Sequence, residues 1–122
     1  MVLLLAPIPG RILRHAIQFR ECTGVDVYQS PKYVAHDVYR VAVQPTVEVH
    51  KTRDNTDVNL KGICYIDARR STAANPVKWM EDSERAGHSA KLDFAMQEYT
   101  VSGVETLYDD TGHIHHWEVL LS

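Results

Sequence analysis

The sequence is short of the residues that usually indicate catalysis. It contains only two cysteines, Cys22 and Cys64, and neither belongs to a CxxC pair or to another metal-binding spacing. No serine lies in a GxSxG elbow, and no glycine-rich loop has the pattern that holds phosphate. We therefore expect a chain that is not an enzyme and that takes no cofactor.

The two thiols differ in their expected surroundings. Cys64 alternates with apolar neighbours, which is typical of a small buried side chain and of an unreactive thiol. Cys22 ends a predicted strand beside Thr23 and Gly24, so we expect it at the surface, where the sequence places no base beside it. A disulfide between the two is the alternative, although disulfides are rare in cytosolic chains.

Long apolar runs are also missing. The opening, residues 1–9 (MVLLLAPIP), lacks the basic start that is typical of a signal peptide, and Pro7 and Pro9 interrupt it. It is also too short to cross a bilayer. We interpret residues 1–10 as an N-terminal arm that packs on the body of the protein or on a neighbouring molecule. No membrane partner is expected.

The chain carries no excess of positive charge. Its formal net charge is −3 at pH 7, which gives no general attraction to nucleic acid or to anionic membranes. Residues 1–53 contain seven Lys and Arg against four Asp and Glu, whereas residues 54–122 contain six against twelve. If the fold separates these two parts, opposite faces of neighbouring copies attract each other and favour head-to-tail assembly.

What the sequence does contain is a repeated alternation of apolar and polar residues, which is typical of strands with one buried face. It predicts strands over residues 13–20, 40–50 and 58–67, and a hairpin over residues 98–121. Pro45 places the second strand at a sheet edge or a bulge, because proline donates no backbone hydrogen bond. Gly62 permits a bulge in the third strand, and Gly103 marks a change of register in the hairpin. The hairpin turns at Asp109-Asp110-Thr111-Gly112.

No segment shows a sustained helical period. Residues 69–91 are predicted as a long loop region with at most a short helical turn near residues 79–85. With 122 residues and 44% hydrophobic composition, the chain fits one domain, residues 1–122, with one core. The sequence therefore predicts a mostly β protein that closes as a small barrel or sandwich with long loops.

The sequence contains seven histidines, and three lie together at His113, His115 and His116. On a strand, His113 and His115 share one face and His116 takes the other, so only two can reach the same ion. We favour polar positions on a hairpin strand and no metal site. The alternative is a small metal- or nucleic-acid-binding β-barrel that uses these three, with further ligands from Asp109, Asp110, His50 or His88.

Several short motifs follow one another in a definite order. Pro9, Leu13 and His15 come first, followed by the valine-rich strand over residues 41–49. The next motif is Gly62-Ile63-Cys64-Tyr65-Ile66-Asp67, and the chain ends with Glu98-Tyr99-Thr100-Val101, Leu107-Tyr108-Asp109 and His115-His116-Trp117-Glu118-Val119. In this order, from His15 to Leu121, the chain resembles the phage minor capsid protein family found in the neck gene clusters of long-tailed phages. It departs from that family at Met96-Gln97, where a glycine usually precedes the Glu-Tyr-Thr-Val motif, and in an insert around residues 86–89.

The resemblance implies a head–tail connector, also called a head-completion or stopper protein. Such proteins are small β-barrels that form a homo-oligomeric ring between the portal–adaptor complex and the tail-side neck proteins. The ring helps to close the DNA-filled head and gives the tail its docking surface. This implies a structural virion protein at the head–tail interface, made in the host bacterial cytoplasm, with at most passing contact with phage DNA.

Within this interpretation, the projecting segments become the candidate site. A charged loop between two predicted strands is the candidate channel-facing loop, and its mixed charge would neither clamp DNA nor strongly repel it: Lys51, Arg53, Asp54, Asn55 and Asp57. The N-terminal arm and the loop over residues 69–91 supply the candidate subunit and partner contacts: Leu3, Leu4, Leu5, Arg69, Arg70 and Trp79.

Overall fold

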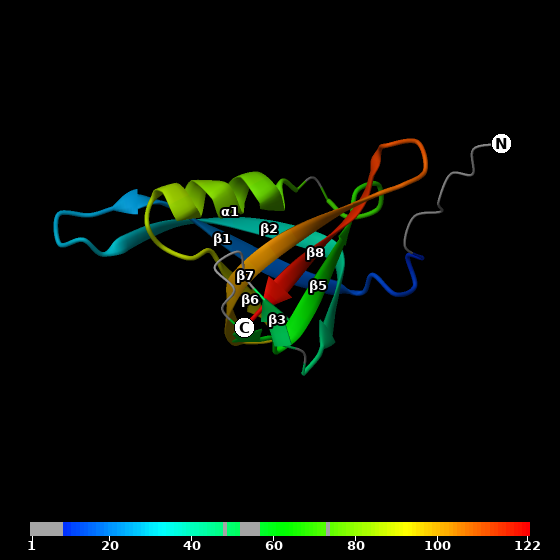
Figure 1. The fold of residues 1–122 in the computed structure, drawn as a ribbon, viewed down its shortest axis with the longest axis horizontal. Helices are drawn as coiled ribbons and strands as arrows, with labels where there is room; N and C mark the ends of the chain where they lie inside the picture. The colour runs from blue at the N-terminus through cyan, green and yellow to red at the C-terminus, as the bar shows by residue number, and fades with distance from the viewer. Residues whose placement is uncertain (1–8, 48, 52–56, 73) are drawn as a thin grey trace.

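The computed structural model describes residues 9–47, 49–51, 57–72 and 74–122. Eight strands and one helix lie in these residues, and Figure 1 shows their arrangement. In chain order they are β1 (His15–Val25), β2 (Pro31–Pro45), β3 (Val49–Lys51), β4 (Asp57–Asn59), β5 (Gly62–Asp67), α1 (Pro76–Arg85), β6 (Lys91–Phe94), β7 (Gln97–Tyr108) and β8 (Ile114–Leu121).

Six antiparallel strands close into a barrel in the order β1-β2-β5-β8-β7-β6. Strands β3 and β4 form a separate two-stranded ribbon in the connection between β2 and β5. The mostly β, barrel-like fold expected from the sequence is therefore confirmed. The β1–β2 and β7–β8 hairpins extend from the barrel toward opposite ends of the long axis of the molecule (Figure 1).

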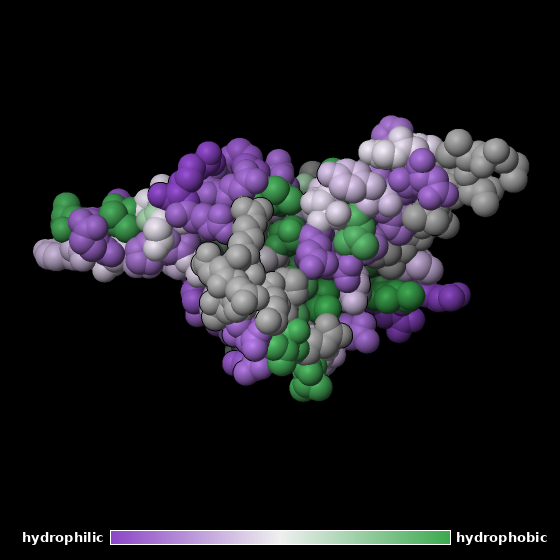
Figure 2. Space-filling view, in the orientation of Figure 1, coloured by the Kyte–Doolittle hydropathy of each residue, from purple (hydrophilic) through white to green (hydrophobic). Residues whose placement is uncertain are grey.

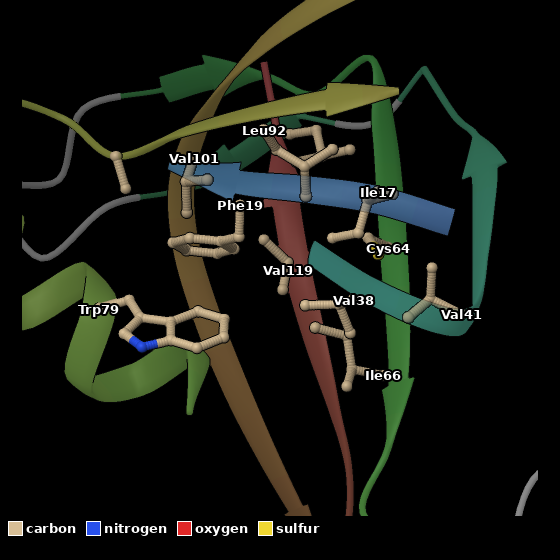
Figure 3. Packing of buried hydrophobic residues seen from close by; sticks show 12 residues of the cluster. Ile17, Phe19, Val38, Val41, Cys64, Ile66, Trp79, Leu92, Val101 and Val119 are labelled. Atoms are coloured by element: carbon tan, nitrogen blue, oxygen red, sulfur yellow. The ribbon is translucent and has the colours of Figure 1, made fainter. Parts of the chain in front are cut away.

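The core fills the barrel and the space between the barrel and α1. Ile17 and Phe19 on β1, which the alternation placed on a buried face, are both buried. Trp79 reaches from α1 toward Phe19, with 5.1 Å between the ring centroids (Figure 3). The remaining members of the buried apolar cluster are Val38, Val41, Cys64, Ile66, Ala90, Leu92, Val101, Val119 and Leu121.

Helix α1 is longer than the short turn that the sequence predicts. The Asn75 side chain accepts from the backbone N–H of Lys78 at 3.4 Å, and Pro76 occupies the first turn, where its missing N–H costs nothing. The helix buries Pro76, Trp79 and Ser83, which are three and four residues apart and so share one face. With only one buried large apolar residue beyond the proline, this face was too short to give a recognisable helical period.

Strand β2 begins nine residues before the predicted start and ends at Pro45, so the expected strand over residues 40–50 is corrected. Val47, which was placed in that strand, is 99% exposed. Arg40 has a left-handed backbone (φ 59°) at the irregularity where Ala16 pairs with Tyr39 and His15 with Val41. Before this bulge, β2 projects as a ribbon with β1, and alternation is weak there because both faces are largely exposed.

The third predicted strand is divided into β4 and β5, which pair with different partners. Gly62 begins β5 and forms no bulge; a Cβ there would lie 3.2 Å from the Gln44 carbonyl oxygen, so glycine permits a close backbone approach. The β7–β8 hairpin is confirmed, as are its change of register at Gly103 and its turn, where Gly112 has φ 84°.

The turn between β6 and β7 contains Met96, which precedes the Gln97 that begins β7. Ala95 and Met96 both have left-handed backbones, with φ 51° and 63°. Two such residues form the turn that suits a two-residue hairpin, where Asn and Gly are the favoured residues. The methionine therefore occupies a conformation that a glycine would adopt without steric cost.

The two oppositely charged parts of the sequence form two adjoining arcs of the barrel. Strands β1 and β2 lie side by side, and the strands of the second part complete the wall, so the parts meet where β1 pairs with β6 and β2 with β5. Arg20 on β1 forms an ion pair with Asp93 on β6 at 2.9 Å and another with Glu98 on β7. These ion pairs neutralise charge where the two parts meet, and the expectation of opposed charged faces stays a prediction.

Candidate assembly surfaces

The tip of the β1–β2 hairpin is held by one carboxylate. Asp26 Oδ1 accepts from the backbone N–H of Tyr28 at 2.8 Å and from that of Ser30 at 3.0 Å. The backbone N–H groups of Asp26 and Gln29 add two further bonds across the loop, to the carbonyl oxygens of Ser30 (2.9 Å) and Asp26 (3.0 Å). The polar groups of this tip are therefore largely satisfied within it, which fixes the direction of its side chains.

The side chains displayed on that frame are apolar. Val27 is 87% exposed and Tyr28 is 85% exposed, with Val25 and Val34 partly exposed at the base of the tip. Figure 2 shows the apolar side chains gathered at this end of the molecule. Exposed apolar groups on a rigid projection are typical of a surface that is covered by another molecule.

The β7–β8 hairpin has a similar frame at the opposite end. Asp109 Oδ1 accepts from the backbone N–H of Thr111 at 2.9 Å, from its hydroxyl at 2.6 Å, and from the backbone N–H of His113 at 3.1 Å. These bonds, led by the Thr111 hydroxyl, lower the pKa of the Asp109 carboxyl. Tyr108 and Ile114 flank the turn and are exposed. Both long hairpins thus carry apolar residues beside an aspartate-stabilised turn.

The histidines of β8 face each other. A bulge beside Leu107 and Tyr108 leaves His115 outside the pairing, and the Nδ1 atoms of His115 and His116 lie 2.7 Å apart. The expectation that these two side chains point to opposite faces is therefore wrong. His113 lies before β8, with its Nδ1 2.7 Å from the Thr111 hydroxyl.

Burial lowers the pKa of His116, although Glu118 lies 3.6 Å from its Nε2 and opposes the shift. Within the described ranges, no three His, Cys, Asp or Glu side chains are grouped so that they could hold a metal ion. The histidine cluster therefore contains a hydrogen-bonded imidazole pair, and the alternative of a metal site stays a prediction.

The candidate channel-facing loop is described only at its two ends. Lys51 ends β3 and Asp57 begins β4, and these two residues pair across the ribbon. Asp57 is exposed. Arg53, Asp54 and Asn55 lie outside the described residues, as do Leu3, Leu4 and Leu5 of the N-terminal arm.

The other predicted contact residues divide into two groups. Arg69 and Arg70 are exposed in the turn after β5, where their backbone N–H groups donate to Asp67 Oδ1 at 2.8 Å each. Trp79, in contrast, is only 9% exposed and stacks on His36 with 4.0 Å between the ring centroids. The expectation that Trp79 contacts a partner is therefore corrected: it anchors α1 to the barrel.

Both thiols are buried and neither forms a disulfide. Burial raises the pKa of the Cys64 thiol to about 12, as expected for an unreactive core residue. Cys22 is completely buried, so the expectation of an exposed thiol is wrong. The reason is α1: Ser83 Oγ accepts from the backbone N–H of Cys22 at 2.8 Å and donates to the carbonyl oxygen of Trp79, which closes the helix over this strand.

No helix in the described part of the chain is long and apolar enough to cross a membrane. Searches of family models, curated proteins and solved structures found no match to this chain.

Sequence reasoning missed Val27 and Tyr28, the most exposed residues of the β1–β2 tip. A signal was present, because these two apolar residues lie between Asp26 and Ser30, which are turn formers. It was overlooked because the strand that follows the turn does not alternate clearly before residue 40.

Proposed function

We propose that this chain is a structural protein of a phage neck, where copies of it form a ring between the portal–adaptor complex and the tail. The ring closes the DNA-filled head and provides the surface on which the tail docks. The observation that carries this proposal is the display of apolar side chains on rigid hairpin turns at opposite ends of a small closed barrel.

The closed barrel supports an assembly role because its wall strands are paired within the molecule. Further association must then use the projecting hairpins and the outer surface. The exposed apolar residues lie largely on those projections: Val27 and Tyr28 on one hairpin, Tyr108 and Ile114 on the other, and Val49 on the β3–β4 ribbon. This arrangement offers separate surfaces to neighbouring copies and to the proteins above and below the ring.

The placement of the two hairpins also suits a ring. A ring needs a head-to-tail contact, in which one surface of each copy meets a different surface of the next. The β1–β2 and β7–β8 hairpins point in opposite directions along the long axis (Figure 1). Within this proposal, the charged loop between β3 and β4 faces the channel, and Arg69 and Arg70 contact a neighbouring protein.

No observation in the described residues favours the alternative of metal or nucleic-acid binding through the histidines. His115 and His116 hydrogen-bond to each other, and His113 contacts Thr111 on the tip. Each of these contacts involves an Nδ1 atom.

The proposal is tested by sedimenting purified protein with tailless, DNA-filled heads of the phage that encodes it. We expect the protein to co-sediment with heads that carry the portal and adaptor. A variant with Val27→Asp and Tyr28→Ser should fold but bind more weakly, because it removes exposed apolar surface without touching the core. A matched control, Thr23→Ser on the exposed flank of β1, should bind normally. Wild-type protein that stays in the supernatant would refute the proposal.

A further inference from the structure

The β1–β2 hairpin contains a free strand edge of defined length. Strand β2 pairs with β1 along most of its length, but it pairs with β5 only from Val41 to Pro45. In the described part of the chain, no strand pairs with the outer side of β2 over residues 31–40. A free edge of this kind can bind an additional extended segment.

Two independent contacts fix the direction of the backbone groups at this hairpin. Tyr39 donates its N–H to Thr72 Oγ1 at 3.0 Å and accepts from the backbone N–H of Thr72 at 3.2 Å, so its polar groups point away from β1. Because backbone groups alternate along a strand, those of Asp37, Ala35 and Tyr33 point the same way.

On the opposite strand, Cys22 directs its N–H to Ser83 Oγ, away from β2. Cys22 is the partner of Tyr33, so both residues of this pair direct their polar groups outward, as the alternation from Tyr39 requires. The β2 edge therefore presents the N–H and C=O groups of three alternate residues.

The two edges of the hairpin differ in how they are covered. On the β1 side, β6 pairs with Gln18 to Arg20, and α1 covers the next residues through the bond from Cys22 to Ser83. On the β2 side, the loop after β5 bonds to Tyr39 and to the Arg40 carbonyl, through Thr72 and Ser71. Beyond these contacts, toward the tip, the described residues place no strand against the β2 edge.

We propose that this edge binds residues 2–6 of a neighbouring copy as an added strand, an inference that rests on the proposed ring. The segment, VLLLA, is the only run of five or more consecutive large aliphatic and alanine residues in the sequence, and its backbone N–H groups are intact until Pro7. Pro7 and Pro9 then end the pairing, because proline donates no hydrogen bond. A segment of five residues matches an edge that presents three alternate residues.

The place of the segment that begins at Pro9 indicates that the added strand comes from a neighbouring copy. The described chain begins at Pro9, and the segment leading into β1 lies at the end of the long axis opposite to the β1–β2 tip (Figure 1). A strand leaving one end of a copy and bound at the other end of the next copy is a head-to-tail contact, which closes into a ring if the rotation permits.

The test uses two proteins, each with one added cysteine, and a short bis-maleimide. One carries Leu4→Cys and the other Ala35→Cys, and the native Cys22 and Cys64 are buried and so react slowly. They are mixed at high concentration, with and without portal–adaptor complexes. We expect a cross-linked dimer from the mixture in at least one condition. As a control, Leu4→Cys is mixed with Tyr108→Cys, an exposed residue on the other hairpin, and this pair should give no dimer.

A second variant tests whether the cross-link depends on backbone pairing at the β2 edge. Ala35→Pro removes an N–H that points away from β1, so the hairpin should still fold but should lose the added strand. Because position 35 is then proline, the cysteine is placed at Thr23 or Val34 instead. The cross-link from this cysteine to Leu4→Cys should be lost when Ala35→Pro is present. No dimer in either condition would overturn the inference. So would a cross-linked monomer from one chain carrying both Leu4→Cys and Ala35→Cys. A ring seen on portal complexes without the cross-link would refute this contact and leave the proposed function standing.

Discussion

At the scale of single residues, the most unusual feature is Met96, which is fully exposed and has a left-handed backbone beside Ala95. Glycine adopts this conformation without the contact between Cβ and the backbone that other residues make. Met96→Gly should therefore raise the free energy of unfolding, by about 1 kcal/mol. Urea unfolding measures the change.

The matched control for this prediction is Ala35→Gly, at an exposed strand residue that is absent from the left-handed set. At that position glycine relieves no strain and only adds conformational entropy to the unfolded chain. The free energy of unfolding should therefore fall by about 0.5–1 kcal/mol. If both substitutions destabilise the protein equally, the strain assigned to the β6–β7 turn is absent.

The pair formed by His115 and His116 predicts a dependence of stability on pH. Burial lowers the pKa of His116 in the folded protein, so folding favours its neutral form. The stability that this provides is present above the ordinary histidine pKa and is lost as the pH falls through that value toward the lowered one.

When the pH is lowered from 7.5 to 5, the free energy of unfolding should therefore fall less in His116→Gln than in the wild-type protein. The two pH values bracket the ordinary histidine pKa of about 6.5. Urea unfolding at both values measures this difference. His113→Gln, on the exposed turn, serves as the control and should follow the wild-type profile. An equal loss in His116→Gln and wild-type protein would contradict the account.

Much of the core was predictable at this scale, whereas the candidate site was not. The burial of Ile17, Phe19 and Cys64 follows from alternation, because a strand has one face toward the core. The burial of Cys22 and Trp79 depends on α1 packing over β1, a contact between segments 61 residues apart in the Cys22–Ser83 bond. A local pattern carries no information about such a contact.

At the scale of elements, the hairpins were predictable where one face is buried and the turn is well marked. The β7–β8 hairpin met both conditions, and its register change at Gly103 was foreseen. The β1–β2 hairpin lacks the first condition near its tip, because it leaves the barrel and both of its faces meet solvent. The projecting part, which carries the proposed assembly surface, therefore had the weakest sequence signal.

The charged connection between β3 and β4 gives a prediction at the same scale. Deleting residues 53–57 should leave the barrel folded, because this connection lies outside the six wall strands. If the loop gates the channel, the phage carrying this deletion should yield heads that leak DNA or lack tails. Electron microscopy and a nuclease-protection assay of the packaged DNA measure both effects. Normal virions would refute the gate role.

At the scale of the whole molecule, closure of the barrel and the direction of its hairpins matter more than any single residue. The closed wall leaves assembly to the projections, and their opposite directions suit a head-to-tail contact. Some charges of the two sequence parts are already neutralised where these parts meet in the barrel. Arg20, for example, is already paired within the molecule with Asp93 and Glu98.

Assembly driven mainly by apolar and backbone contacts should persist at high salt, where exposed charges are screened.

The most direct test of the central claim is electron microscopy of DNA-filled, tailless heads before and after addition of the purified protein. The account predicts a new ring of density at the portal vertex, continuous with the channel, into which the barrel and its two hairpins fit. A portal vertex that looks the same with and without the protein, although the protein is folded and in excess, would contradict it.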